Sequence, residues 1–106
     1  MKAIKINAEA MCLEVVTIEN YKDIYAHIGD NCRTFAVPVV LDNNDGIYID
    51  DEGLYNDYTM GFMFKDWAYP IVGNGLICGA DDMGESIDAQ SKLEDIAKKL
   101  FWVKLK

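Results

Sequence analysis

The stretch Ile71-Val72-Gly73-Asn74-Gly75-Leu76-Ile77-Cys78-Gly79 carries the strongest local signal in the chain. Asn-Gly between two apolar runs is typical of a β-hairpin turn, because both residues tolerate the positive φ angles that such a turn requires. The sequence therefore predicts two paired strands on either side of Asn74. An acidic turn at 81–85 follows this hairpin, and residues 86–88 are expected to return as a short strand.

The residues before this stretch predict alternating strands and turns with one helix. Strands are expected at 3–6 and 12–18, and a helix from Tyr21 to Ile28 with Asn20 as its N-cap and Gly29 as its stop signal. A strand at 33–37 reaches Pro38, which is typical of a sheet edge or a strand end. A turn at 42–46 returns the chain as a strand at 47–49, and another turn follows at 50–53. Residues 54–69 have no clean period, so helix and strand stay equally open there.

The residues after it predict a second helix. Ser91-Lys92-Leu93-Glu94 matches a capping box, with Ser91 as N-cap. An apolar stripe at helical spacing follows: Leu93, Ile96, Ala97, Leu100 and Phe101. Residues 102–105 continue this helix or turn into a last strand.

These elements and the length of 106 residues predict one domain, residues 1–106. The expected class is α+β, a small antiparallel or mixed sheet of five to six strands with two helices, which we expect on one face of the sheet.

The negative net charge of the chain limits the kinds of molecule that it is expected to bind. The net charge is −8, and residues 7–91 hold three cations (Lys22, Arg33 and Lys65) against sixteen carboxylates. Such a body repels phosphate backbones, so nucleic-acid binding is disfavoured. No apolar run approaches the ~20 residues of a membrane helix, and no signal peptide is recognised. We therefore expect a cytoplasmic protein without membrane contact.

The candidate catalytic groups are few. Cys12, Cys32 and Cys78 lack metal-ligand spacing and are expected to be free, buried thiols in a reducing compartment. His27 could act as a base for one of them only if the tertiary structure brings them together. The glycines at 73–79 lack the third glycine and the helix of a dinucleotide fingerprint. We therefore expect no cofactor and no enzymatic activity.

Aromatic residues concentrate in one segment. Residues 55–69 hold half of the chain's twelve aromatic residues, and such side chains anchor either cores or interfaces. The candidate interaction residues are these aromatics, the hairpin amide and the carboxylates of the acidic turn: Tyr55, Tyr58, Phe62, Trp67, Tyr69, Asn74, Asp81, Asp82 and Glu85.

Residues 47–54 and 71–85 resemble a family catalogued as domain of unknown function thirty-eight forty-six, found in phages, plasmids and integrative elements of bacteria. The resemblance rests on the Asp-Glu-Gly-Leu turn at 51–54, the Gly-Asn-Gly at 73–75 and the Gly-x-Asp-Asp-x-Gly-Glu at 79–85. It implies a mobile-element accessory protein in a bacterial cytosol, and it brings no catalytic residue with it.

The function predicted from these observations is a non-enzymatic module that binds a protein partner through an acidic surface and aromatic anchors. One alternative is a protein that binds or sequesters a nucleotide-like small molecule near 73–75. Another is a metal-dependent hydrolase that uses Asp81, Asp82 and Glu85. A homodimer through the sheet edge near Pro38 stays open.

Overall fold

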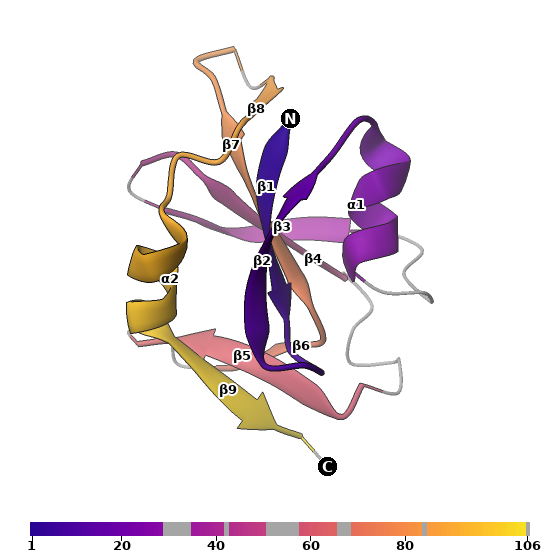
Figure 1. The fold of residues 1–106 in the computed structure, drawn as a ribbon, viewed down its shortest axis with the longest axis vertical. Coiled ribbons are helices and arrows are strands. Elements are labelled where there is room, and N and C mark those ends of the chain that lie inside the picture. The colour runs from indigo at the N-terminus through magenta and orange to yellow at the C-terminus, as the bar shows by residue number, and fades with distance from the viewer. Residues whose placement is uncertain (29–34, 42, 51–57, 66–68, 84, 106) are drawn as a thin grey trace.

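The computed structural model describes residues 1–28, 35–41, 43–50, 58–65, 69–83 and 85–105. Within these ranges the chain forms two helices and nine strands in two antiparallel sheets (Figure 1), so the predicted α+β class is confirmed. The single predicted sheet is replaced by two. The elements are β1 (Lys2–Asn7), β2 (Cys12–Thr17), α1 (Tyr21–Ile28), β3 (Phe35–Val40), β4 (Gly46–Asp50), β5 (Met60–Phe64), β6 (Ile71–Val72), β7 (Gly75–Ala80), β8 (Ser86–Ile87), α2 (Leu93–Lys99) and β9 (Leu100–Lys104).

The larger sheet has the strand order β2-β1-β7-β4-β3, with the short β8 paired to the end of β7. β7 lies at the centre because five of its six residues are buried, which suits a strand with neighbours on both sides. β3 is an edge strand, as Pro38 predicts, and its register with β4 shifts between Ala36 and Val39. The expected return strand at 86–88 is present as β8.

The smaller sheet has the order β6-β5-β9 and corrects the prediction made from Asn74. β6 pairs with β5, whereas β7 pairs with β1 and β4, so the two strands beside Asn74 belong to different sheets and form no hairpin. The local turn itself is real, since Gly73 has a φ of 82°. The chain uses it to cross from one sheet to the other.

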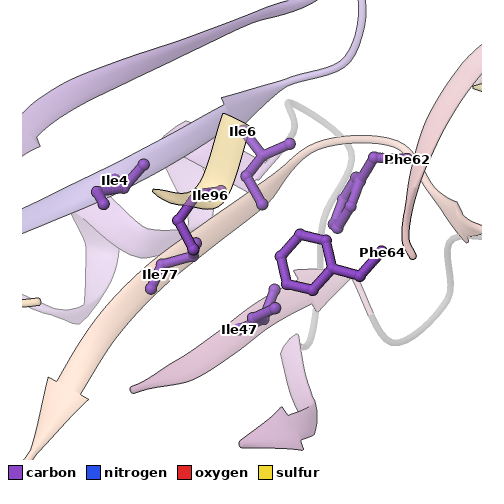
Figure 2. Packing of buried hydrophobic residues seen from close by; sticks show 7 residues of the cluster. All are labelled: Ile4, Ile6, Ile47, Phe62, Phe64, Ile77 and Ile96. Carbon is purple, nitrogen blue, oxygen red and sulfur yellow. The ribbon is translucent and has the colours of Figure 1, made fainter. Parts of the chain in front are cut away.

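The two faces of the larger sheet bury different clusters. One face packs Ile4, Ile6, Ile47 and Ile77 against Phe62 and Phe64 of β5 and Ile96 of α2 (Figure 2). The opposite face packs Ala3, Leu76 and Cys78 against Ile18 and against Ile24 and Ile28 of α1. The helices therefore lie on opposite faces of this sheet, not on one face as expected (Figure 1). The reason is the period of two along β1 and β7, which alternates apolar side chains between both faces.

The two helices differ in how well their ends were predicted. α1 begins after Asn20, whose Oδ1 accepts a hydrogen bond from the Lys22 N–H at 2.9 Å, as expected of an N-cap. α2 does not form the predicted capping box, because its N-cap is Lys92 and has no side-chain cap. The Ser91 hydroxyl instead accepts a hydrogen bond from Asn43 Nδ2 at 2.9 Å. Residues 102–104 belong to a last strand, one of the two alternatives, but β9 already begins at Leu100, so Leu100 and Phe101 of the predicted helical stripe belong to the strand.

Candidate interaction surface

The three predicted aromatic anchors in the described residues differ in burial. Phe62 is fully buried in the core, with 0% exposure, so its assignment as an interaction residue is wrong. Tyr58 is half-buried: its hydroxyl donates to Asp50 Oδ2 at 2.9 Å, and its ring covers Gly73. Tyr69 is 80% exposed, just before β6. Tyr55 and Trp67 lie outside the described residues.

Asn74 and Asp81 hold the backbone of turns. Asn74 Oδ1 accepts a hydrogen bond from the Ala8 N–H at 2.8 Å, which ties the crossing between the two sheets to the end of β1. Asp81 Oδ1 accepts hydrogen bonds from the Met83 and Glu85 N–H groups, each at 2.9 Å. This is the local bonding for which Asp is favoured in turns.

The other carboxylates of the acidic turn, Asp82 and Glu85, are exposed. Met83, between them, is 89% exposed. In the described part of the chain, no group of three or more His, Cys, Asp or Glu side chains is placed to hold a metal ion. Asp81 is half-buried and Asp82 and Glu85 are exposed, and all three stand between β7 and β8 in the chain.

Two carboxylates of the predicted turns at 42–46 and 50–53 are buried. Asp45 is fully buried, and its two oxygens accept hydrogen bonds from the backbone N–H groups of Gln90 and Ser91 at 2.7–3.0 Å. Asp50 is also buried and accepts the hydrogen bond from Tyr58. Both residues stand in turn-forming sequences, so a structural use of the carboxylate could not be separated from turn propensity. Their partners lie in other parts of the chain.

The two thiols in the described residues, Cys12 and Cys78, both have raised pKa values. Burial raises the pKa of Cys78 to about 11, with the nearby charge of Asp45 as a second cause. Cys78 is free and buried as expected, whereas Cys12 is only half-buried, and Cys32 lies outside the described residues. The Cys12 thiol donates to Glu14 Oε1 at 3.4 Å, and partial burial together with Glu14 raises its pKa. Both described thiols are thus protonated near neutral pH, the unreactive form.

The pKa of His27 responds to two of the charges that also act on Cys12, those of Lys5 and Glu14. Burial, and then the positive charge of Lys5, lower the pKa of His27, while Asp23 and Glu14 act in the opposite direction. No hydrogen bond between His27 and Cys12 is present in the described part of the chain, and the Cys12 thiol bonds to Glu14 instead. This arrangement disfavours a thiolate, and it gives no support to a Cys-His catalytic pair.

The smaller sheet presents an apolar surface on the side opposite the core. The inner side of this sheet packs against the core cluster through five side chains: Phe62, Phe64, Ile71, Leu100 and Trp102. Since side chains alternate along a strand, their neighbours Met63, Val72, Phe101 and Val103 point away from it; we call these four residues the outer face. None of the four belongs to either core cluster, and Phe101 is 52% exposed.

The register brings the outer face together across the sheet. Met63 of β5 lies opposite Phe101 of β9, and Gly61 of β5 pairs with both Val103 and Val72. Gly61 is required there, because a Cβ at this position would meet the Ile71 carbonyl oxygen. The outer face therefore spans all three strands.

Four exposed lysines stand at the ends of the elements that form or adjoin this sheet. Lys65 follows β5, Lys104 ends β9, and Lys98 and Lys99 end α2; all four are exposed. Residues 92–106 carry five lysines against two carboxylates, whereas the remaining chain carries five cations against sixteen carboxylates. The molecule thus has an apolar and basic end on an otherwise acidic body.

Comparison with known proteins assigns the chain to a family. A family model described as Domain of unknown function (DUF3846) matches residues 1–101. The chain belongs to this family. The DUF3846 match confirms the resemblance carried by 47–85 and extends it over nearly the whole chain. No curated protein and no solved structure matches.

The DUF3846 motif residues have structural roles in this chain. Gly73 adopts a positive φ beneath the Tyr58 ring, and a Cβ at Gly75 would lie 2.7 Å from Phe62 Cζ. A Cβ at Gly79 would meet the Asp88 carbonyl, where the chain crosses toward α2. Together with Asn74 and Asp81, these residues position backbone segments. The motif therefore shapes the crossing between the two sheets and the turn after β7.

None of the helices in the described ranges is long and apolar enough to cross a membrane.

Proposed function

We propose that this protein is a non-enzymatic protein-binding module whose partner docks on the outer face of the smaller sheet. The observation that carries the proposal is the exposure of Phe101 beside Met63 and Val103. Contiguous apolar side chains with a polar rim are typical of protein interaction sites. A ring such as Phe101 buries a large apolar area when it is covered, so it serves as the anchor.

The charges change the partner chemistry predicted from composition. An acidic surface alone favours a basic partner, but the exposed lysines at the ends of β5, β9 and α2 favour an acidic partner at this end. The acidic body has a separate effect, because it repels an acidic partner from the rest of the molecule and so directs it to the basic end. We therefore expect association to weaken as ionic strength rises.

The family resemblance supports a proposal about the cellular context in which the protein acts. We propose that the protein acts as an accessory protein of a bacterial mobile element, in the cytoplasm, by occupying a partner from the host or from the element itself. Its net charge of −8 supports solubility at high concentration, which an occupying protein needs.

A capture experiment with paired variants tests the docking face. Phe101→Ser removes the anchor, while Met83→Ser removes another exposed apolar side chain, which is 89% exposed in the turn after β7. Proteins cross-linked to each form in a lysate of the native host are quantified by mass spectrometry. Proteins retained by the wild type and by Met83→Ser are expected to be lost from Phe101→Ser. Equal retention by all three forms would contradict the proposal, and matching thermal melts confirm that the variants fold.

A further inference from the structure

The hydrogen bonds between β9 and β5 determine which backbone N–H and C=O groups of β9 point outward from the edge of the smaller sheet. The Leu105 N–H donates to the Thr59 carbonyl, and the Lys65 N–H donates to the Lys99 carbonyl, at 2.9 and 2.8 Å. In an antiparallel pair such hydrogen bonds recur at every second residue. Phe101 and Val103 therefore direct their backbone groups toward β5, and Trp102 and Lys104 direct theirs away from it.

Among the described strands, only β5 pairs with β9, so the outward groups of Trp102 and Lys104 have no strand partner there. A row of such groups is a template for a further strand. Two of the other edges, β6 and β3, are less suited to addition. β6 has two residues, and β3 contains Pro38, which lacks an N–H. The edge at β9 is also the one that adjoins Phe101 and Val103 of the outer face.

We propose that the partner adds an extended strand of alternating apolar and acidic residues to β9; this rests on the proposed docking at the outer face. Its backbone pairs with Trp102 and Lys104. Because side chains alternate between the two faces of a sheet, its apolar residues lie beside Phe101 and Val103. Its acidic residues lie on the opposite face, the one that carries Lys104.

Charge decides between this occupant and a second copy of the chain. Pairing two β9 strands about a two-fold axis would bring Lys104 and the basic end of α2 of both copies together, and like charges oppose this. Lysine on an edge strand is a recognised barrier to self-pairing. For an acidic strand the same lysines are favourable neighbours.

Amide hydrogen exchange measured by NMR on the full chain tests the proposal. The probe is a short capped peptide of alternating glutamate and valine, and a peptide of alternating lysine and valine is its control. With the acidic peptide at about ten times its dissociation constant, exchange at the Trp102 and Lys104 amides is expected to slow about tenfold. The Phe101 and Val103 amides, already bonded to β5, are expected to stay unchanged. The basic peptide is expected to leave all four amides unchanged.

Two variants at one exposed position separate charge from backbone pairing. Lys104→Ala removes the charge alone, and Lys104→Pro removes the charge together with the outward N–H, at an edge position that tolerates proline. We expect Lys104→Ala to weaken binding of the acidic peptide a few-fold and Lys104→Pro to weaken it by a further factor of about ten. Equal affinities of the two variants would overturn backbone pairing.

Three further results would overturn the strand addition. The first is unchanged exchange at Trp102 and Lys104 at every soluble concentration of the acidic peptide. The second is equal slowing by the basic peptide. The third is protection of both amides without peptide, together with a dimer in analytical ultracentrifugation, which would make a second copy the occupant. If any of these occurs while Phe101→Ser still loses its captured proteins, docking at the outer face stands and only the strand addition fails.

Discussion

The carboxylate of Asp45 joins the hairpin of β3 and β4 to the segment that leads into α2, and replacing it with alanine tests this connection. The side chain is fully buried and accepts hydrogen bonds from the Gln90 N–H at 2.9 and 3.0 Å and from the Ser91 N–H at 2.7 Å. These residues are 45 and 46 positions away along the chain. Asp45→Ala leaves both backbone donors without this acceptor.

The expected loss of stability follows from those two donors. A donor that loses a charged acceptor costs about 1–3 kcal/mol, and the lower half of this range applies because the two N–H groups are only partly buried. We therefore expect Asp45→Ala to lower the free energy of unfolding by about 3 kcal/mol. For a domain of this size that corresponds to a fall in Tm of roughly 12–24 °C.

Thermal and urea unfolding followed by circular dichroism measure the effect. Asp82→Ala is the matched control, because Asp82 is exposed and its replacement is expected to change stability by less than about 0.5 kcal/mol. The α2 amides of Asp45→Ala are also expected to exchange faster than those of the control. A loss below about 1 kcal/mol in Asp45→Ala would refute the reasoning, since water would then replace the carboxylate at little cost.

Two further predictions concern the central strand. Gly75→Ala places a Cβ 2.7 Å from Phe62 Cζ, so we expect urea unfolding to show a loss of about 1–3 kcal/mol; a more stable variant would contradict this packing. Burial raises the pKa of Cys78 from its ordinary 9.0 to about 11, so the folded state favours the protonated thiol. The stability that this contributes is present below about pH 9 and is lost as the pH rises from about 9 to 11. Urea midpoints across that range are expected to fall more steeply for the wild type than for Cys78→Ala, and parallel curves would contradict the assignment.

The elements with strong local signals could be predicted from the sequence. The expected bounds of β1, β2, α1 and β4 are close to those observed, whereas β3 runs through Pro38 to Val40, three residues past its expected end. Their signals are local: β-branched runs, an Asn N-cap, and a turn in which Asn44 adopts a positive φ of 71°. Each of these preferences acts within a few residues, so tertiary contacts had little to change.

The pairing of strands could not be read in the same way. Asn74 and its neighbouring glycines do turn the chain, but Asn74 bonds to Ala8 and β7 inserts between β1 and β4. In its central position in the larger sheet, β7 buries Leu76, Ile77 and Cys78, whose side chains alternate between the two faces of the sheet. A two-stranded hairpin of β6 and β7 could not bury them in this way. Long-range burial thus outweighed the local hairpin preference.

The candidate site shows the same division. Sequence identified the aromatic segment, yet only the alternation along β5 decided that Phe62 faces the core while Met63 faces outward. Phe101 was assigned to a helical stripe, and pairing of β9 with β5 placed it on the outer face instead.

By itself the sequence determined the α+β class, the acidic body with its basic C-terminal segment, and the turns built by Asn, Asp and Gly. The tertiary structure decided which strands pair, that the two helices lie on opposite faces of the larger sheet, and which apolar side chains stay uncovered. The physical reason is the distance along the chain over which each effect acts. Turn and cap preferences depend on backbone angles and hydrogen bonds within a few residues, whereas burial depends on which distant segments meet.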